Sequence, residues 1–235
     1  MGVSNLVIIN TKDDNWHMSI RSAVEKISPA RGIEYVKEYY APGRPFYSGS
    51  HFEKLEAYNN LPDRITSSDL MAVATLDTPI YKKATIGILI KEAAEMNALL
   101  AEIPERSLRS ISEDEFATYL GSGSAALQLW DTLRRNGRNQ ERWNVGPTRA
   151  SKIMARKRPH LIPIRDSVID EVVGHKPKPH DWKLWWEALV EDDYLETRAE
   201  ELREAIGLSD LSTLRALDVM LWMHGTNARK SQALL

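Results

Sequence analysis

A short turn that leads into a helix is the first feature of this sequence whose residues could do chemistry. Residues 143–150 are Trp-Asn-Val-Gly-Pro-Thr-Arg-Ala, so Gly146 directly precedes Pro147, and proline is favoured at the first position of a helix. Backbone amides at a helix N-terminus favour an anion. The turn is therefore predicted to hold a phosphate through Asn144, Val145 and Gly146.

Positive charge is concentrated around this turn. The 235 residues include 31 Lys or Arg and 33 Asp or Glu, a net charge of −2. Residues 134–165 contain ten cations and one acid, so they carry +9 and the remaining chain −11. Such a patch is expected to contact a phosphate backbone. With about five phosphate contacts, log K of binding is expected to fall with log salt concentration with a slope near −4 to −5. The alternative is a solvated face balanced by acids elsewhere. The cations expected to follow the backbone are Arg149, Lys152, Arg156, Lys157 and Arg158.

Asp166 is the carboxylate best placed for catalysis. It precedes the apolar helical pattern of Val168, Ile169 and Val172, which ends at Gly174. A carboxylate at a helix N-terminus is kept ionised by the backbone amides and the helix dipole, which suits charge stabilisation better than proton donation. The alternative is a simple N-cap that contributes about 1 kcal/mol to the fold and does no chemistry.

Together these features resemble the helix-hairpin-helix DNA glycosylase superfamily over about residues 122–175. In that superfamily a Gly-hydrophobic-Gly turn precedes a helix that has a small residue four positions after the second glycine. Val145, Gly146 and Ala150 match this pattern, and Asn144 replaces the first glycine. Asn is among the few residues that accept a left-handed conformation. The catalytic Asp of the superfamily lies about twenty residues beyond the second glycine, and Asp166 is twenty residues beyond Gly146.

The resemblance implies that DNA is the partner and that an N-glycosidic bond is cleaved. Cleavage builds positive charge on the sugar, and Asp166 would stabilise that charge or accept a proton from the attacking water. Bifunctional members carry a lysine two residues after the second glycine and cut the strand through a Schiff base, whereas this chain has Thr148. Monofunctional adenine-removing members are similar in having a small hydroxyl residue there, so the expected catalytic residues are Thr148 and Asp166.

No cofactor and no metal are expected. Some members of the superfamily hold an iron–sulfur cluster with four cysteines, but this chain has no Cys, which also excludes cysteine zinc sites. The absence of Cys favours a reducing compartment. No apolar run approaches the ~18 residues that a membrane span needs. The protein is therefore expected in the cytoplasm and away from membranes.

Two tryptophans are candidates for a base pocket. A glycosylase flips its target base and holds it by stacking on apolar and aromatic side chains. Trp182 and Trp185 share one helical face and are expected in the core, whereas Trp186 falls off that face and Trp143 lies beside the turn. Trp143 and Trp186 are therefore expected to be exposed and to contact the base.

Helical spacing of apolar residues recurs from end to end and predicts an all-α, two-lobed fold with a helix-hairpin-helix motif. Residues 1–104 are expected to form an N-terminal lobe, and 105–235 a lobe with the hairpin and the C-terminal helices; one compact domain is the alternative. Capping boxes are expected at residues 66–69 and 112–115, a long helix at 79–103 with Gly87 as its weak point, and a last helix at 209–225.

The whole chain also resembles a family of unknown function found largely in actinobacteria, over segments that include residues 47–52, 66–76 and 214–222. That resemblance brings no activity with it. Three functions stay open: a monofunctional DNA glycosylase of DNA repair, a non-catalytic nucleic-acid-binding module in which Asp166 is only a cap, and an interaction protein whose basic face meets an acidic partner. The sequence implies no particular base, lesion or oligomeric state.

Overall fold

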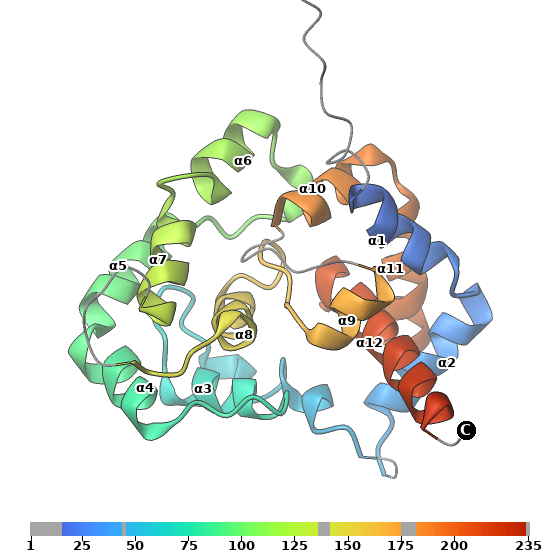
Figure 1. The fold of residues 1–235 in the computed structure, drawn as a ribbon, viewed down its shortest axis with the longest axis horizontal. Coiled ribbons are helices and arrows are strands. Elements are labelled where there is room, and N and C mark those ends of the chain that lie inside the picture. Colours follow the sequence, from blue (N-terminus) through green and yellow to red (C-terminus); the bar gives the residue numbers. More distant parts are fainter. Residues whose placement is uncertain (1–15, 44–45, 136–141, 175–181, 234–235) are drawn as a thin grey trace, which may run out of the picture.

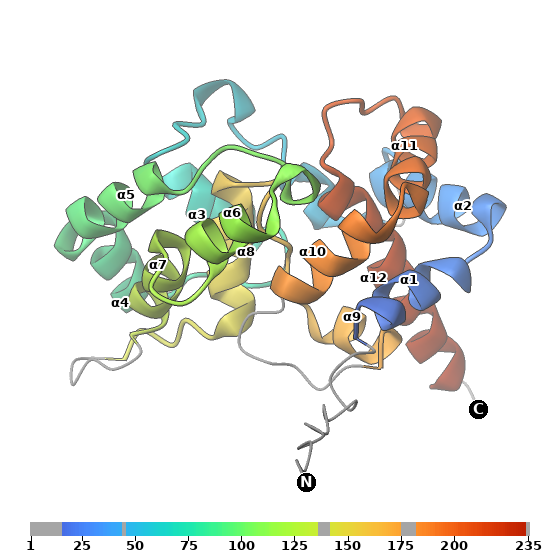
Figure 2. The ribbon, with the colours of Figure 1, turned by 90° about the horizontal axis from the view of Figure 1, so that it is seen from above.

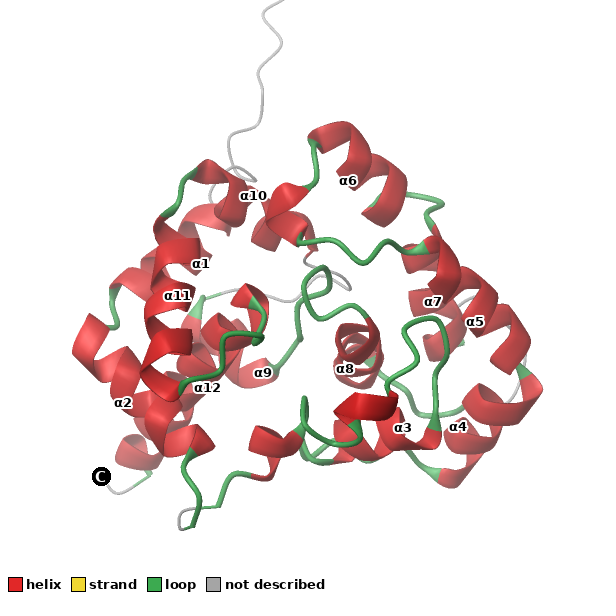
Figure 3. Ribbon diagram, turned by 180° about the vertical axis from the view of Figure 1, so that it is seen from behind, coloured by secondary structure: helices red, strands yellow, loops and turns green. Residues whose placement is uncertain are grey.

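The computed structural model describes residues 16–43, 46–135, 142–174 and 182–233. In these segments every regular element is a helix and there is no strand (Figure 3), which confirms the predicted all-α class. None of the described helices is long and apolar enough to cross a membrane.

The elements follow one another in a simple order along the chain. Four short 3₁₀ or π turns lie at Ser48–His51 (η1), Ala57–Asn59 (η2), Gly87–Lys91 (η3) and Leu108–Ser110 (η4). The α-helices are α1 (Trp16–Glu25), α2 (Pro29–Tyr40), α3 (Ser67–Ala74), α4 (Lys82–Ile86), α5 (Ala93–Glu102), α6 (Glu113–Leu120), α7 (Ala125–Arg134), α8 (Pro147–Lys157), α9 (Ser167–Val172), α10 (Trp182–Glu191), α11 (Tyr194–Ile206) and α12 (Thr213–Gln232).

The helices fall into two groups (Figure 1). In one, α1 packs on α10 and α12, α2 packs on α11 and α12, and α9 lies against α12. In the other, α7 packs on α5 and α6, and α8 contacts both α3 and α7. The view turned by 90° shows the same two groups (Figure 2). This packing differs from the expected division near Pro104, because the N-terminal helices α1 and α2 lie with the C-terminal helices.

Short-range sequence signals fix the starts of two helices. Thr66 accepts a hydrogen bond from the Asp69 amide, and the Asp69 carboxylate accepts one from the Thr66 amide, so α3 begins with a capping box. Ser112 and Glu115 form the same reciprocal pair at the start of α6. Both predicted capping boxes are therefore confirmed, since each needs only residues three positions apart.

The expected long helix between residues 79 and 103 is interrupted in the middle. The π turn η3 begins at Gly87, the predicted weak point, and separates α4 from α5. The indole of Trp143 lies against Gly87, where an added Cβ would stand 2.1 Å from ring atom Cζ2, so only glycine fits. The helix loses its regularity at the residue that admits the Trp143 ring.

The last helix also differs from its prediction, and the difference positions Asp166. Ser212 caps α12, and the helix continues past Gly225 to Gln232. A Cβ on Gly225 would lie 2.5 Å from Cγ1 of Val168 and 2.6 Å from Cγ2 of Val172, both on α9. Gly225 therefore allows close packing of two helices rather than ending one. Because Asp166 is the N-cap of α9, this contact sets where Asp166 lies relative to α12.

Candidate active site

Three of the residues singled out in the sequence line one cavity. Thr148, Lys152 and Asp166 border a space of about 390 Å³, which we call the aspartate cavity. Helices α8, α9 and α12 enclose it together with residues 46–49 and 75–78. Its volume is in the range of small-molecule sites in proteins. The fold thus brings the two expected catalytic residues, Thr148 and Asp166, to one site.

The Asp166 carboxylate is both a helix cap and a cavity group. Its Oδ1 accepts a hydrogen bond from the Val168 amide at 3.0 Å, and its Oδ2 lies 3.3 Å from Nζ of Lys152. Lys152 Nζ also donates to the Leu76 carbonyl at 3.1 Å. The Asp166 side chain is 19% exposed and that of Lys152 only 4%. Lys152 therefore serves this cavity and is not available to a DNA backbone.

A second carboxylate, Asp218 on α12, lines the same cavity and was not singled out in the sequence. Burial raises the pKa of Asp218 to about 6; its partner Arg215 opposes this shift and the nearby charge of Asp166 adds to it. Asp218 therefore keeps its proton at a pH where an ordinary aspartate has lost it. Two carboxylates with different surroundings thus share one site.

Arg215 holds this part of the site together from inside the protein. Its guanidinium pairs with the Asp218 carboxylate, and its Nε lies 2.5 Å from Oε1 of Glu53. Its Nη2 donates to the Tyr39 hydroxyl and to the Gly49 carbonyl, both at 3.0 Å. Burial lowers the pKa of Arg215, but the charge of Glu53 and the other acidic groups around it raise it well above its usual value. Arg215 is therefore a permanent cation that orients Asp218.

An aromatic wall faces these charged groups. The rings of Tyr39 and Tyr47 stack with centroids 5.4 Å apart, and Trp222 meets both edge-on at 6.0 and 6.1 Å. All three residues line the aspartate cavity. The Tyr47 hydroxyl donates to Oε1 of Glu38 at 2.7 Å, and burial together with this bond raises the pKa of Tyr47 to about 12. Such rings can hold a planar ligand by stacking.

The two tryptophans expected in a base pocket do not line this cavity. Trp143 is only 4% exposed, because its ring is covered by Gly87 and by the Arg135 guanidinium, 4.4 Å from the ring centroid. The expectation that Trp143 is exposed is therefore wrong. Trp186 is half-buried, packs on Phe116 and donates from Nε1 to the Ile111 carbonyl at 3.0 Å. Trp182 and Trp185 are buried as expected.

The C-terminal end of α8 corrects the prediction of a continuous basic face. The side chains of Arg156, Lys157 and Arg158 are 5%, 0% and 2% exposed. Arg156 donates to the carbonyls of Phe52, Glu53 and Leu55, and Arg158 to those of Pro62, Leu100 and Ile103. Because their donors are used internally, the expectation that these three cations follow a DNA backbone is wrong.

One buried acid, Asp69, neutralises two of these cations. Its Oδ1 lies 3.3 Å from Nε of Arg156, and its Oδ2 lies 3.0 Å from Nζ of Lys157. Asp63 pairs with Arg158 at 2.6 Å. We call Asp69, Arg156, Lys157 and Arg158 the buried charge cluster. It ties α8 to the start of α3, to residues 52–63 and to the end of α5.

The turn before α8 has two features predicted from its sequence, the left-handed Asn144 and a helix that begins at Pro147. Asn144 is exposed and has φ +57°, the left-handed conformation expected of a residue that replaces glycine. Gly146 caps α8 without a side-chain hydrogen bond, and a Cβ there would meet nothing within 4 Å. Val145 is buried and anchors the turn. The amides at the start of α8 are therefore approachable from outside.

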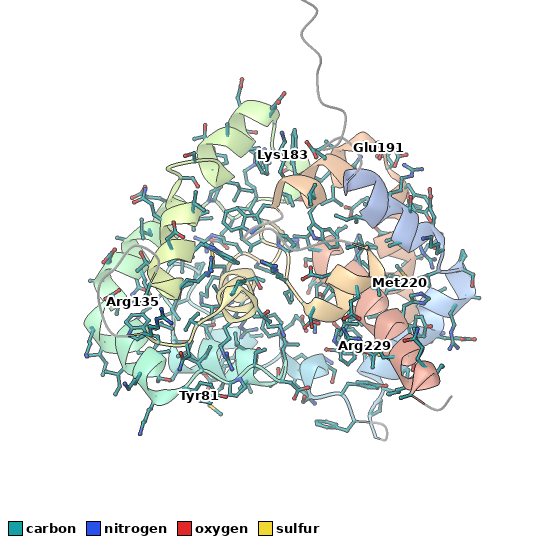
Figure 4. All side chains as sticks on the ribbon, in the orientation of Figure 1. Tyr81, Arg135, Lys183, Glu191, Met220 and Arg229 are labelled. Atoms are coloured by element: carbon teal, nitrogen blue, oxygen red, sulfur yellow. The ribbon has the colours of Figure 1, made fainter. Side chains whose placement is uncertain are left out.

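Cations near this turn remain at the surface. Arg142 is exposed, and the half-buried Arg149 donates to the Pro79 carbonyl at 2.9 Å and to the Asn144 carbonyl at 3.2 Å. The Arg149 guanidinium lies 5.0 Å from the ring centre of Tyr81, which precedes the exposed Lys82 at the start of α4. Figure 4 shows Tyr81 there and Arg135 at the end of α7. Arg138 lies outside the described residues.

One sequence signal could have revealed the groups that were missed on α12. Arg215, Asp218 and Trp222 are spaced by three and four residues, so they share one face of a helix that is otherwise apolar. Charged residues inside an apolar helical stripe must find buried partners. Tyr39 and Tyr47 carry no comparable signal. Within the described residues no cluster of three or more potential metal ligands occurs.

Comparison with known protein families gives one match. Residues 32–225 match a family of unknown function (DUF6308), and the chain belongs to that family. The matched range includes the turn, the aspartate cavity residues and most of α12. No curated protein and no solved structure matches the chain.

Proposed function

We propose that this protein binds DNA and hydrolyses an N-glycosidic bond, as a monofunctional DNA glycosylase or a relative of one. The observation that carries the proposal is the cavity that Asp166 shares with Thr148, which lies two residues after Gly146, the residue that caps α8 without a side-chain hydrogen bond. The resemblance of residues 122–175 to helix-hairpin-helix glycosylases supports the same conclusion. The DNA-contacting surface is the turn at Asn144 and Gly146 with Arg142, Arg149 and Lys82.

In this proposal the turn and the cavity have separate tasks. The amides at the start of α8 and the surrounding cations bind phosphates and position the strand. A base turned out of the duplex enters the aspartate cavity and stacks on the wall of Tyr39, Tyr47 and Trp222, which replaces the expected pair Trp143 and Trp186. DNA affinity and base release are then properties of two neighbouring regions.

The two carboxylates divide the chemistry between them. As the bond between base and sugar breaks, the base leaves with the electron pair and positive charge develops on the sugar, where the Asp166 carboxylate stabilises it. Asp218 donates its proton to the leaving base, and Asp166 accepts a proton from the water that adds to the sugar. Thr148 holds that water by its hydroxyl. Base release is therefore expected to decline above about pH 6, as Asp218 loses its proton.

The test is base release from duplex oligonucleotides that carry damaged or mismatched bases, detected as abasic sites. Asp166→Asn is expected to lower the rate by about 10²- to 10⁴-fold while DNA binding is kept. Asp170→Asn is the matched control, because Asp170 lies on the same helix but pairs with Arg165 and does not line the cavity. Base release that is unchanged in Asp166→Asn would remove Asp166 from the mechanism.

A second function is favoured by the contacts of Asp166. Both of its oxygens have partners, the Val168 amide and Lys152, as a purely structural cap requires. In a non-catalytic nucleic-acid-binding module, DNA binding would persist in the same experiment without release of any base. The burial of Lys152, Arg156, Lys157 and Arg158 argues against the third alternative, a basic face for an acidic partner, because these cations do not form a face.

A further inference from the structure

A second cavity lies behind the aspartate cavity and is not used by the proposed reaction. It has a volume of about 380 Å³ and is lined mainly by apolar side chains from residues 52–57, from α8 and from the segment before α12. Arg215, Asp218 and Ile164 line both spaces, so they form the partition between them. We call it the second cavity. Its size and apolar lining are those of a small-molecule site.

Two buried oxygens, on residues that line the second cavity, lack hydrogen-bond partners within the described part of the chain. They are the Tyr40 hydroxyl and Oε2 of Glu53, whose other oxygen is bound by Arg215. Both residues line the cavity. Buried polar atoms are nearly always hydrogen-bonded, and one left unpaired costs the free energy of its lost hydration. A ligand whose N–H groups reach these two oxygens would remove that cost.

The two buried cations around the second cavity are already occupied, whereas the third cation of its lining, Lys54, is exposed and lies over the Tyr40 ring, 5.6 Å from the ring centroid. Arg156 directs its donors to backbone carbonyls and Asp69, and Arg215 directs its donors to Glu53, Asp218, Tyr39 and Gly49. What the deep part of the cavity offers is an acceptor carboxylate, a hydroxyl and apolar surface, including the Phe52 ring. A carboxylate ligand would place two anions together there, which is unfavourable.

We propose that the second cavity binds a small aromatic molecule that carries N–H donors and no negative charge. The apolar walls cover the ring, Glu53 Oε2 accepts one N–H, and the Tyr40 hydroxyl bonds the remaining polar atom. This site is separate from the glycosylase proposal, since binding requires neither DNA nor base release. Arg215 pairs with both Glu53 and Asp218 and lies in the partition between the two cavities. A ligand bound to Glu53 is therefore linked through Arg215 to the wall of the aspartate cavity.

The experiment uses three probes of the same size on the full chain: benzamide, benzamidine and benzoate, followed by ligand-observed NMR. Benzamide and benzamidine are expected to bind saturably with dissociation constants on the order of 1 mM, and benzoate at least about ten-fold more weakly. Tyr40→Phe is expected to weaken the binding of benzamide by about 2- to 10-fold, which is the effect of losing one hydrogen bond. Equal binding of benzoate, or no saturable binding of benzamide, would overturn the proposal.

A pair of matched variants shows which cavity the probe occupies. Ala57 is exposed and lines only the second cavity, whereas the half-buried Thr78 lines only the aspartate cavity. Ala57→Trp is expected to abolish benzamide binding and Thr78→Trp to leave it unchanged, with both variants as cooperatively folded as the parent. The opposite pattern would assign the probe to the aspartate cavity and overturn the proposed site, while leaving the glycosylase proposal untouched.

Discussion

The two ends of α8 carry cations in very different surroundings. Before its first turn, Asn144 and Arg142 are exposed and Gly146 leaves the first amides uncapped. At its last turn, the side chains of Lys157 and Arg158 are at most 2% exposed and bind Asp69, Asp63 and backbone carbonyls. A run of basic residues can therefore be exposed at one end and part of the internal scaffold at the other. The difference depends on acids that lie about 90 residues away in the sequence.

The largest expected effect comes from removing the acid at the centre of the buried charge cluster. Asp69→Asn leaves Arg156 and Lys157 buried without their anion, so the free energy of unfolding is expected to fall by about 3–5 kcal/mol. Urea denaturation measures this loss. The control is Asp210→Asn, because Asp210 is exposed, and it is expected to change stability by less than about 0.5 kcal/mol. Similar values for both variants would show that the basic end of α8 is not internal.

The next effect concerns the buried acid of the aspartate cavity. The pKa of Asp218 is about 6 in the folded protein and 3.8 for an ordinary aspartate, as in the unfolded chain. The folded state therefore binds this proton more tightly. Its contribution to stability is present below about pH 4 and is lost as the pH rises through 6, by up to about 3 kcal/mol. When the unfolding free energies of wild type and Asp218→Asn are measured from pH 4 to 7, the wild type is expected to lose stability relative to the variant as the pH rises. A constant difference would contradict the raised pKa.

A smaller effect is expected where α9 meets α12. Gly225→Val places methyl groups against Val168 and Val172 and is expected to cost about 1–3 kcal/mol by overpacking. Because α9 carries Asp166, base release should fall more than DNA affinity. Ala228→Val, on the exposed face of the same helix, adds the same kind of side chain without that contact. If both variants behave alike, the contact at Gly225 does not position Asp166.

Features encoded by neighbouring residues could be predicted from the sequence. The two capping boxes and the left-handed conformation of Asn144 depend on side chains within three or four positions or on one residue's own backbone preference. The sequence also singled out Thr148 and Asp166, which line one cavity, from a resemblance that gives the offset of each from Gly146. These predictions required no knowledge of how distant helices pack.

Features that depend on long-range packing could not be predicted. Nothing near Arg158 shows that Asp63 and the end of α5 will surround it, and nothing near Trp143 shows that Gly87 will open a place for its ring. Asp218 reaches the cavity only because α9 lies close to α12. Arg158 and Trp143 are thus buried by partners far along the chain, although local patterns place them at the surface. The helical spacing of Asp218 indicates burial, but not the cavity that it reaches.

The salt dependence of DNA binding tests most directly the claim that only the N-terminal end of α8 faces DNA. In the proposed complex Arg142, Arg149 and Lys82 would provide about three phosphate contacts, so the slope of log K against log salt is expected to be about −2 to −3. A slope near −4 to −5, the value for five contacts, would mean that cations beyond these three also meet the backbone and would contradict this account. Affinity independent of salt would exclude DNA binding altogether.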